Sequence, residues 1–353
     1  MFKSAKTRYL PEPTDPHAFD FDPPIRDYRS IGILLINLGT PDKPTPSSIK
    51  TYLREFLSDT RVIEMPQIVW QLILRGFVLP FRPKKLAEKY SQIWFEEGSP
   101  LLVYSQDQAK GVEERLRKQG LDVHCELGMR YGNPSIQSAM DKLQQKGCER
   151  ILVLPLYPQY AASTTATAID TVNRYAARRR NQPEMRFIKR YADDKGYINC
   201  MANKVKQFWQ EKGMPDYLLL SYHGLPRQVI ELGDPYYRDC MDTTMRLKEA
   251  LGAEGHRVKA SFQSRFGAQE WVQPYTEPTL RDWAKKGVKR VDVMCPGFLA
   301  DCLETLEEIQ IECHDAFLED GGEELNYIPC LNNDANWLDA LTDIAKRNLG
   351  GWY

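Results

Sequence analysis

Short apolar runs alternate with longer helical patterns along most of the chain. We expect the apolar runs to be β-strands, at residues 31–37, 123–128, 150–156, 185–188, 217–222, 258–263, 290–294 and 327–329. Between them, helical patterns cover residues 46–57, 105–119, 135–146, 165–180, 197–212, 243–251, 279–286, 303–317 and 336–348. Strands that alternate with helices in this way are typical of repeated βα units, and they predict an α/β protein built on parallel sheets.

The length of 353 residues exceeds that of a usual single domain. We therefore expect two α/β domains, at 30–176 and 177–335, the second of which carries the candidate residues His223 and Glu304. The proline-rich residues 1–29 are expected to form a loosely held tail. The last helix, within 336–353, is expected to pack back on the first domain.

The composition is that of a soluble globular protein, with 42% hydrophobic and 27% charged residues. The net charge of −1 argues against a basic nucleic-acid-binding surface, so we expect no nucleic-acid partner. The eight cysteines form no CxxC pair, which favours a reducing compartment over a disulfide framework or a structural zinc site. Because there is no apolar run of about 18 residues and no secretory signal, we expect a cytoplasmic protein that does not span a membrane.

One segment departs from the alternating pattern. Residues 66–85 are very apolar, are interrupted by a glycine and two internal prolines, and end in cations. A buried helix over 68–74 is one interpretation. Since the interruptions disfavour one continuous buried helix, we interpret 77–85 as an exposed apolar lip. Such a lip could contact a flat ligand or the periphery of a membrane.

Three carboxylates, Glu304, Glu308 and Glu312, stand four residues apart in the helical pattern that follows strand 290–294 and a Pro-Gly turn. Like charges at this spacing cost about 0.2–0.5 kcal/mol per pair, so the row is unfavourable for the helix alone. A solvated charged face is the alternative interpretation, and we assign Glu307 to such a face. Glu304 differs because it lies in the first helical turn after a strand. Parallel sheets bind ligands there, and the helix dipole favours an anion.

His223 ends the strand at 217–222 and is followed by a Gly-Leu-Pro turn. Because the carboxyl ends of parallel strands share one edge of a sheet, we expect His223 to lie near the carboxylate row. An imidazole that faces carboxylates suits a divalent metal such as Fe2+, and it also suits proton transfer. We interpret the other histidines as surface or packing residues; these are His17, His124, His256 and His314.

Aromatic and cationic residues also follow the ends of the other strands. They include Arg130, Tyr131, Tyr160, Arg265 and Trp271. Several such side chains at one edge indicate a pocket for a large flat ligand. The chain has no GxGxxG after its first strand, no GxxxxGK[ST] and no GxSxG, so NAD, nucleoside triphosphates and Ser-His hydrolysis are disfavoured.

A set of motifs together resembles the ferrochelatase family. The motifs are Leu-Ile-Asn-Leu-Gly-Thr-Pro at 35–41, Leu-Tyr-Pro-Gln-Tyr at 156–160, Ser-Tyr-His-Gly-Leu-Pro at 221–226 with Gly-Asp-Pro-Tyr at 233–236, Phe-Gln-Ser-Arg-Phe-Gly at 262–267 and Asp-Cys-Leu-Glu-Thr-Leu at 301–306. They occur in the order of the family and cover residues from about 31 to 335. The resemblance implies an α/β, chelatase-like fold. This fold has two Rossmann-like domains, each with a four-stranded parallel sheet flanked by helices, and a porphyrin cleft between them.

The resemblance also implies a reaction, the insertion of Fe2+ into protoporphyrin IX to form protoheme, which is the final step of heme biosynthesis. It assigns His223 and Glu304 to metal and proton chemistry on opposite sides of a distorted macrocycle. Glu308 and Glu312 continue the metal-binding row on a helix with π-type widening. The implied porphyrin contacts are Leu38, Arg82, Arg130, Tyr131, Tyr160, Ser264 and Trp271.

Family members with a [2Fe-2S] cluster carry a cysteine near the Tyr-Pro-Gln-Tyr motif, or several in a C-terminal extension. Here Ala161 and Ala162 follow Tyr160, so we expect no cluster, no permanently bound cofactor and, without the extension, a monomer. The motif wording resembles that of the bacterial protoporphyrin enzymes rather than the coproporphyrin ones. Two alternatives stay open: a non-catalytic tetrapyrrole or metal carrier, and a chelatase for cobalt or nickel, since these ligands do not select iron by affinity.

Overall fold

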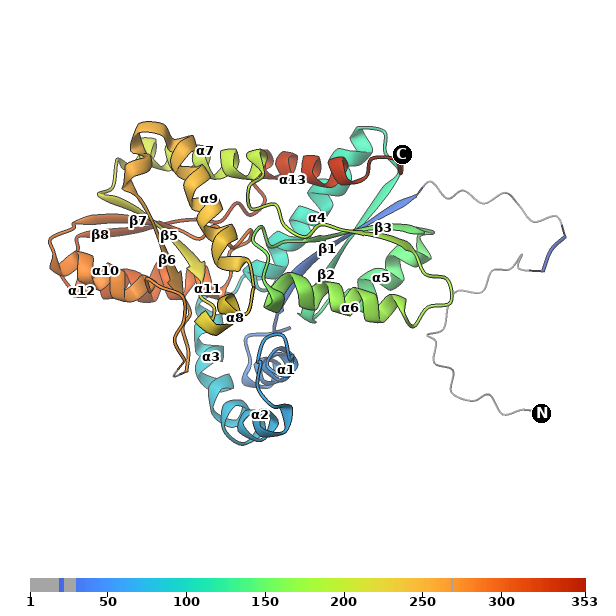
Figure 1. Cartoon of the computed structure of the whole chain (residues 1–353), viewed down its shortest axis with the longest axis horizontal. Coiled ribbons are helices and arrows are strands. Elements are labelled where there is room, and N and C mark those ends of the chain that lie inside the picture. Colours follow the sequence, from blue (N-terminus) through green and yellow to red (C-terminus); the bar gives the residue numbers. More distant parts are fainter. Residues whose placement is uncertain (1–18, 22–29, 268) are drawn as a thin grey trace.

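The computed structural model describes residues 19–21, 30–267 and 269–353 (Figure 1). Apart from 19–21, the expected tail lies outside the described residues. Two four-stranded parallel sheets form the framework, which confirms the predicted fold class. The strand order of the first sheet is β2 (Val123–Gly132), β1 (Ile31–Thr40), β3 (Arg150–Pro155) and β4 (Glu184–Phe187). The order of the second sheet is β6 (Val258–Gln263), β5 (Tyr217–His223), β7 (Arg290–Met294) and β8 (Glu324–Ile328).

Helices cover both faces of each sheet, as continuous apolar strands require. In the first half they are α1 (Pro46–Phe56), α2 (Gln67–Ile73), η1 (Leu74–Val78), α3 (Leu79–Ile93), α4 (Pro100–Lys118), α5 (Ile136–Gln145), η2 (Ala162–Ala166) and α6 (Thr167–Ala176). In the second half they are α7 (Lys195–Lys212), α8 (Arg227–Glu231), α9 (Tyr236–Leu251), η3 (Gly252–Arg257), α10 (Thr276–Lys285), α11 (Leu303–Leu306), η4 (Glu308–Cys313), α12 (His314–Glu319) and α13 (Ala335–Asn348). The segments η1, η2 and η4 are π-helices.

The strand expected at 185–188 does not belong to the second half. As β4, it pairs in parallel with β3, with Arg150 opposite Glu184 and Val153 opposite Phe187. The boundary predicted between residues 176 and 177 therefore falls inside the first sheet. The sequence pattern identifies a strand, but it does not indicate which strand lies beside it. The strand β4 is short and only partly buried, at the edge of the first sheet.

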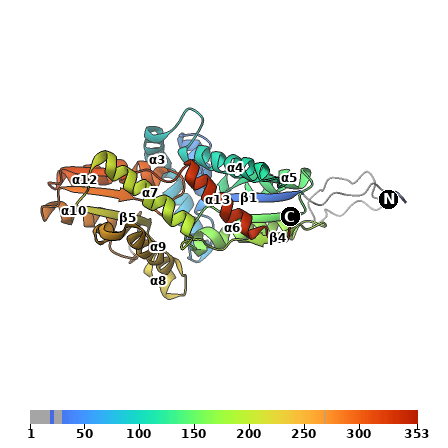
Figure 2. The ribbon, with the colours of Figure 1, turned by 90° about the horizontal axis from the view of Figure 1, so that it is seen from above.

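The two sheets share one apolar core. Buried side chains of β1, such as Leu35, belong to the same cluster as Leu220 of β5. Trp337 of α13 is also in this cluster, and α13 packs on α4 and β3 of the first half and on α7 of the second. Figure 2 shows α7 and α13 lying side by side over the junction between the halves. This shared packing fixes the edges of the two sheets relative to each other.

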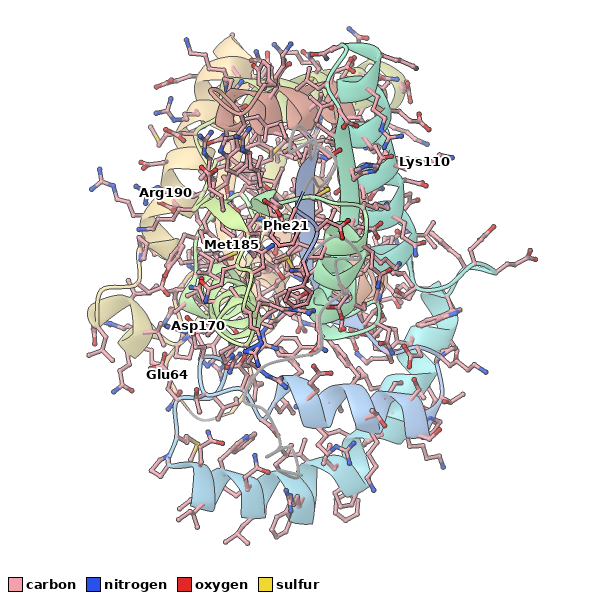
Figure 3. All side chains as sticks on the ribbon, turned by 90° about the vertical axis from the view of Figure 1, so that its right-hand side faces the viewer. Phe21, Glu64, Lys110, Asp170, Met185 and Arg190 are labelled. Carbon is pink, nitrogen blue, oxygen red and sulfur yellow. The ribbon has the colours of Figure 1, made fainter. Side chains whose placement is uncertain are left out.

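The segments α2, η1 and α3 form an arm that projects from the first half (Figures 1 and 3). The glycine and prolines do not interrupt the helix as expected, because the chain stays helical throughout 67–93. Phe77 and Phe81 are exposed, as the lip interpretation predicted, whereas Ile68 and Leu72 are also exposed, so 68–74 is not a buried helix. Leu79 N–H bonds to Leu74 O across the π-turn, and Pro80 then lies in the first turn of α3, where a backbone donor is not needed. At the base of the arm, Arg61 Nε lies 2.6 Å from an oxygen of Asp170, which is labelled in Figure 3.

Candidate active site

His223 stands at the carboxyl end of β5, opposite Gln263 at the end of β6. Its Nδ1 lies 2.7 Å from the carbonyl oxygen of Gly224, and its ring centroid lies 6.3 Å from that of Trp271. When Nδ1–H donates to this carbonyl, Nε2 is left as an acceptor for a proton or a metal. Residue 224 must be glycine, because a Cβ there would lie 2.8 Å from Gln263 O and 3.0 Å from the indole of Trp271.

The carboxylate of Glu308 is held at the end of β6, next to this imidazole. Ser264 donates its N–H over 2.7 Å and its hydroxyl over 2.5 Å, and Gln263 Nε2 donates over 3.2 Å. Ser264 has a φ of 63°, a left-handed conformation that lets both of its donors reach the carboxylate. Burial raises the pKa of Glu308, while the bonds from Ser264 and Gln263 and the charge of His223 oppose that rise. His223 therefore lies within electrostatic reach of the Glu308 carboxylate.

Glu304 lies one helical turn earlier, on α11, which packs against the arm helix α3. Its backbone oxygen accepts a 2.6 Å hydrogen bond from Gln263 Nε2, which ties α11 to the end of β6. Burial raises the pKa values of Tyr52 on α1 and Tyr90 on α3, and the negative charge of Glu304 raises both further. Glu308 is thus within electrostatic reach of His223, and Glu304 is within reach of Tyr52 and Tyr90.

The carboxylate row continues on a widened helix, as the resemblance implied. The π-helix η4 begins after Glu307, and Glu312 N–H donates to Glu307 O over 3.0 Å. Glu307 is not on a solvated face, which corrects our expectation: it is 5% exposed, and its carboxylate contacts Lys89 of α3 at 2.8 Å. The same ammonium lies 2.6 Å from Glu312. Packing of the arm helix against α11, together with the Lys89 ion pair to η4, creates this environment, and the local sequence does not reveal it.

Arg130 and Tyr131, at the end of β2, are both bound to Asp59. Arg130 forms an ion pair with Asp59 and donates from Nε to Thr167 Oγ1 over 2.7 Å, while the hydroxyl of Tyr131 donates to Asp59 over 2.9 Å. Although burial raises the pKa of Asp59, the bonds from Thr167 and Tyr131 and the charge of Arg130 lower it overall. Tyr131 is completely buried, and Leu38 packs on the same apolar cluster. Sequence reasoning missed Asp59, because its partners lie far away along the chain.

The remaining predicted contacts divide between two regions. The guanidinium of Arg82 on the arm lies 5.9 Å from the ring centroid of Phe266, whose ring lies 5.5 Å from that of Trp271. The arm therefore reaches the loop after β6, close to His223. Tyr160 lies elsewhere, with its backbone N–H bonded to Asp239. The structure thus brings Ser264, Trp271 and Arg82 towards His223 but places Tyr160 next to α9.

The predicted metal ligands are His223, Glu304, Glu308 and Glu312. Across residues 19–21, 30–267 and 269–353, no three histidine, cysteine, aspartate or glutamate side chains gather closely enough to hold a metal ion. Glu312 is bound to Lys89 and Glu308 to Ser264, so the ligand set stays a prediction. Gln263, which links the backbone of Glu304 to the carboxylate of Glu308, was missed as a site residue. The pairing of β6 with β5 could have identified it, because both strands end at this point.

Comparison with known proteins gives consistent results. The family model described as Ferrochelatase matches residues 30–349. The ferrochelatase of Bordetella pertussis (strain Tohama I) is 56% identical over 345 residues, which cover 98% of this chain and 95% of that protein. The ferrochelatase of Dechloromonas aromatica (strain RCB) is 49% identical over 348 residues, with coverage of 98% and 93%.

Solved structures support the fold. The sirohydrochlorin chelatase SirB from Bacillus subtilis subspecies spizizenii, in complex with cobalt, matches with a TM-score of 0.52 and 13% identity. The match covers 92% of this chain and 98% of that one. SirB from Bacillus subtilis with Fe3+ has the same TM-score at 16% identity, over 72% of this chain and 92% of that one. At these identities the likeness concerns the architecture alone.

Proposed function

The chain belongs to the ferrochelatase family, and from this premise we propose that it uses protoporphyrin IX as its porphyrin and His223 and Glu304 as its catalytic residues. It is a metal-inserting lyase that places Fe2+ in a porphyrin during heme synthesis, in agreement with the prediction from the motifs. The observation that carries the residue assignment is the arrangement at the facing sheet edges. There Gln263, which lies opposite His223, donates to both the backbone oxygen of Glu304 and the carboxylate of Glu308.

Insertion requires that two pyrrole N–H protons leave while Fe2+ loses its water ligands. The Nε2 atom of His223 is an acceptor when Nδ1–H donates to Gly224 O, so it can take a pyrrole proton or bind the metal. Glu304 supplies a second acceptor from the other side of the macrocycle. Glu308 and Glu312 extend the acidic path towards solvent, and together with His223 and Glu304 they form the proposed set of metal ligands.

A flat porphyrin keeps its nitrogen lone pairs in the ring plane, which hinders attack by the metal. A site that binds a bent macrocycle more tightly than a flat one lowers the barrier through differential binding. We assign the porphyrin contacts to Leu38, Arg82, Arg130, Tyr131, Tyr160, Ser264 and Trp271. Because Tyr131 is fully buried and Arg130 is bound to Asp59, these two contacts require a rearrangement when porphyrin binds.

Incubation of the purified protein with anaerobic Fe2+ and either protoporphyrin IX or coproporphyrin tests the choice of substrate. We expect kcat/KM to be at least about tenfold higher for protoporphyrin, because coproporphyrin carries two additional propionates, which would need cationic partners beyond Arg82 and Arg130. The visible spectrum of the metalated product provides the readout. Equal rates, or faster turnover of coproporphyrin, would contradict the proposal. Parallel reactions with Co2+ and Ni2+ test whether iron is the preferred metal.

We also propose that the arm contacts a membrane at its periphery through residues 66–85. Ile68, Leu72, Phe77 and Phe81 are all more than two-thirds exposed on the arm, and cations lie near them in the sequence. Exposed apolar side chains flanked by cations suit the surface of an anionic bilayer. Among the described residues, the helices are all too short or too polar to cross a membrane.

Sedimentation with anionic vesicles measures this contact. The double variant Phe77→Ser/Phe81→Ser is expected to lower the bound fraction at least about tenfold, because each phenylalanine contributes about 1.5–3 kcal/mol when fully buried. Met245→Ser, at an exposed apolar residue of α9, serves as the control and should bind as the wild type does. If the double variant sediments as strongly as the control, the arm does not contact the bilayer.

Three further assignments accompany this proposal: the protein is cytoplasmic, acts as a monomer and carries no [2Fe-2S] cluster. The basis for the first and the last is the sequence, in which Ala161 and Ala162 follow Tyr160 and the eight cysteines form no CxxC pair. Burial raises the pKa of several, including Cys295 and Cys302, and so keeps them as unreactive thiols.

A further inference from the structure

Lys89 of the arm helix α3 binds two carboxylates of the other domain at once. Its Nζ lies 2.8 and 2.9 Å from the two carboxylate oxygens of Glu307 and 2.6 Å from an oxygen of Glu312. An ammonium has three N–H donors, so these contacts account for its full capacity. The Glu307 side chain is only 7% exposed, whereas that of Glu312 is 53% exposed. The ion pair therefore reaches from the interior to the surface.

The two carboxylates belong to one widened turn of the helix. Glu312 N–H donates to Glu307 O over 3.0 Å, the bond that defines a π-turn. Lys89 thus links the side chains of Glu307 and Glu312, the same two residues whose backbones are joined by the π-turn hydrogen bond. In a regular α-helix, Glu304, Glu308 and Glu312 would lie along one face. Here Glu308 is bound to Ser264 near His223, while Glu312 is bound to the arm.

We infer that Lys89 is a positioning residue for metal insertion: it keeps Glu307 and Glu312 bound to the arm and weakens the hold of Glu312, the outermost proposed ligand, on a divalent cation, so that the ion passes on to the inner ligands. The inference rests on the proposed role of Glu304 and His223 as the inner metal site. Two carboxylates and one ammonium carry a net charge of −1, whereas the same carboxylates without Lys89 carry −2. A bare pair of this kind would compete with the inner site for Fe2+.

Lys89 also connects the arm to the metal-binding helix. The arm contacts the loop after β6 through Arg82 and Phe266, and it contacts η4 through Lys89. A displacement of α3 would therefore move Glu312 or release it. The arm and Glu312, at the outer end of the carboxylate row, are thus coupled through Lys89.

The test compares full-length wild type with Lys89→Met, which removes the charge and keeps an unbranched side chain. We expect Lys89→Met to bind Mn2+ about tenfold more tightly in the absence of porphyrin, since a repelling unit charge within 3 Å of the carboxylates is gone. We expect kcat for Fe2+ insertion to fall about fivefold, with the KM for porphyrin unchanged. Electron paramagnetic resonance of free Mn2+ measures the binding, and anaerobic initial rates give the kinetic constants.

Three further variants test whether Lys89 positions the carboxylates or only stabilises the fold. Lys89→Arg should restore wild-type Mn2+ affinity and kcat, and Lys89→Met/Glu312→Gln should lose the additional Mn2+ binding. Lys146→Met removes a lysine that lies 2.6 Å from Glu126 on the first domain, and it should change neither quantity. Should Lys89→Met unfold, Lys89→Gln provides the same charge change with hydrogen-bonding capacity retained.

Unchanged Mn2+ affinity in the folded, uncharged variants would overturn the inference. So would a loss of activity that Lys89→Arg does not restore. The Mn2+ measurement requires no chelation activity, so it stands apart from the proposed function. A wild-type protein that fails to metalate any porphyrin would overturn that function instead.

Discussion

The variant His223→Ala is expected to lose iron insertion by about 10²–10⁴-fold in kcat, the usual contribution of a positioned acid–base group. The imidazole stands at the end of β5 with its Nδ1 against the carbonyl of Gly224, so Nε2 is free to accept a proton or to bind iron. Alanine can do neither. The Gly-Leu-Pro turn that follows β5 has no side chain that could replace the imidazole. Porphyrin binding should persist, because Trp271 and Ser264 remain.

Anaerobic steady-state rates give kcat, and quenching of porphyrin fluorescence gives the dissociation constant. His256→Ala is the matched control, since His256 also places its Nδ1 2.8 Å from a backbone carbonyl, that of Ala253, but lies in η3 outside the site. We expect this control to turn over at the wild-type rate. Normal turnover by His223→Ala would refute the assignment of the imidazole.

The variant Glu304→Gln is expected to lower kcat by at least about 10²-fold, because it removes a proton acceptor and a metal ligand while keeping the size of the side chain. Glu304 differs from its neighbours in the row: Glu308 is held by Ser264 and Gln263, and Glu312 by Lys89. The charge of Glu304 instead acts on Tyr52 and Tyr90 across the domain junction. We therefore propose Glu304 as the carboxylate that meets a porphyrin from this side.

This variant also distinguishes an enzyme from a carrier. A carrier needs a cleft and ligands but no proton acceptor, so Glu304→Gln would leave carrier function almost unchanged. The measurement pairs initial rates with porphyrin affinity. Glu319→Gln, an exposed glutamate at the end of α12 that is paired with Arg281, is the control and should retain full activity. Full activity in Glu304→Gln would contradict the mechanism proposed above.

Much of the architecture could be predicted from local pattern. The apolar runs at 258–263 and 290–294 are the strands β6 and β7 as found, because a strand buried on both faces needs an uninterrupted apolar sequence. The arm was harder to predict. Pro83 within a helix usually indicates an interruption, yet here the segment stays helical, with a π-turn at η1, Leu74 in the apolar core and Pro83 buried.

The candidate site, too, could be predicted from the sequence only in part. The sequence alone indicated that His223 and Glu304 follow strands whose carboxyl ends meet at one edge, and the motifs around them identified the family. It could not indicate which groups surround each carboxylate. Lys89 lies 218 residues from Glu307 along the chain, and Asp59 lies 71 residues from Arg130. Pairing over such separations depends on how whole helices pack across the domain junction.

By itself, therefore, the sequence determined the succession of strands and of most helices outside the arm, the class of the fold and the residue types that carry the chemistry. These follow from hydrophobic periodicity and from motifs a few residues long. The tertiary structure alone decided that β4 joins the first sheet, that Glu307 is buried and paired, and that Glu308 and Glu312 point to different partners. The physical reason is that burial and electrostatic partners come from distant segments, whose approach is set by the packing of the core as a whole.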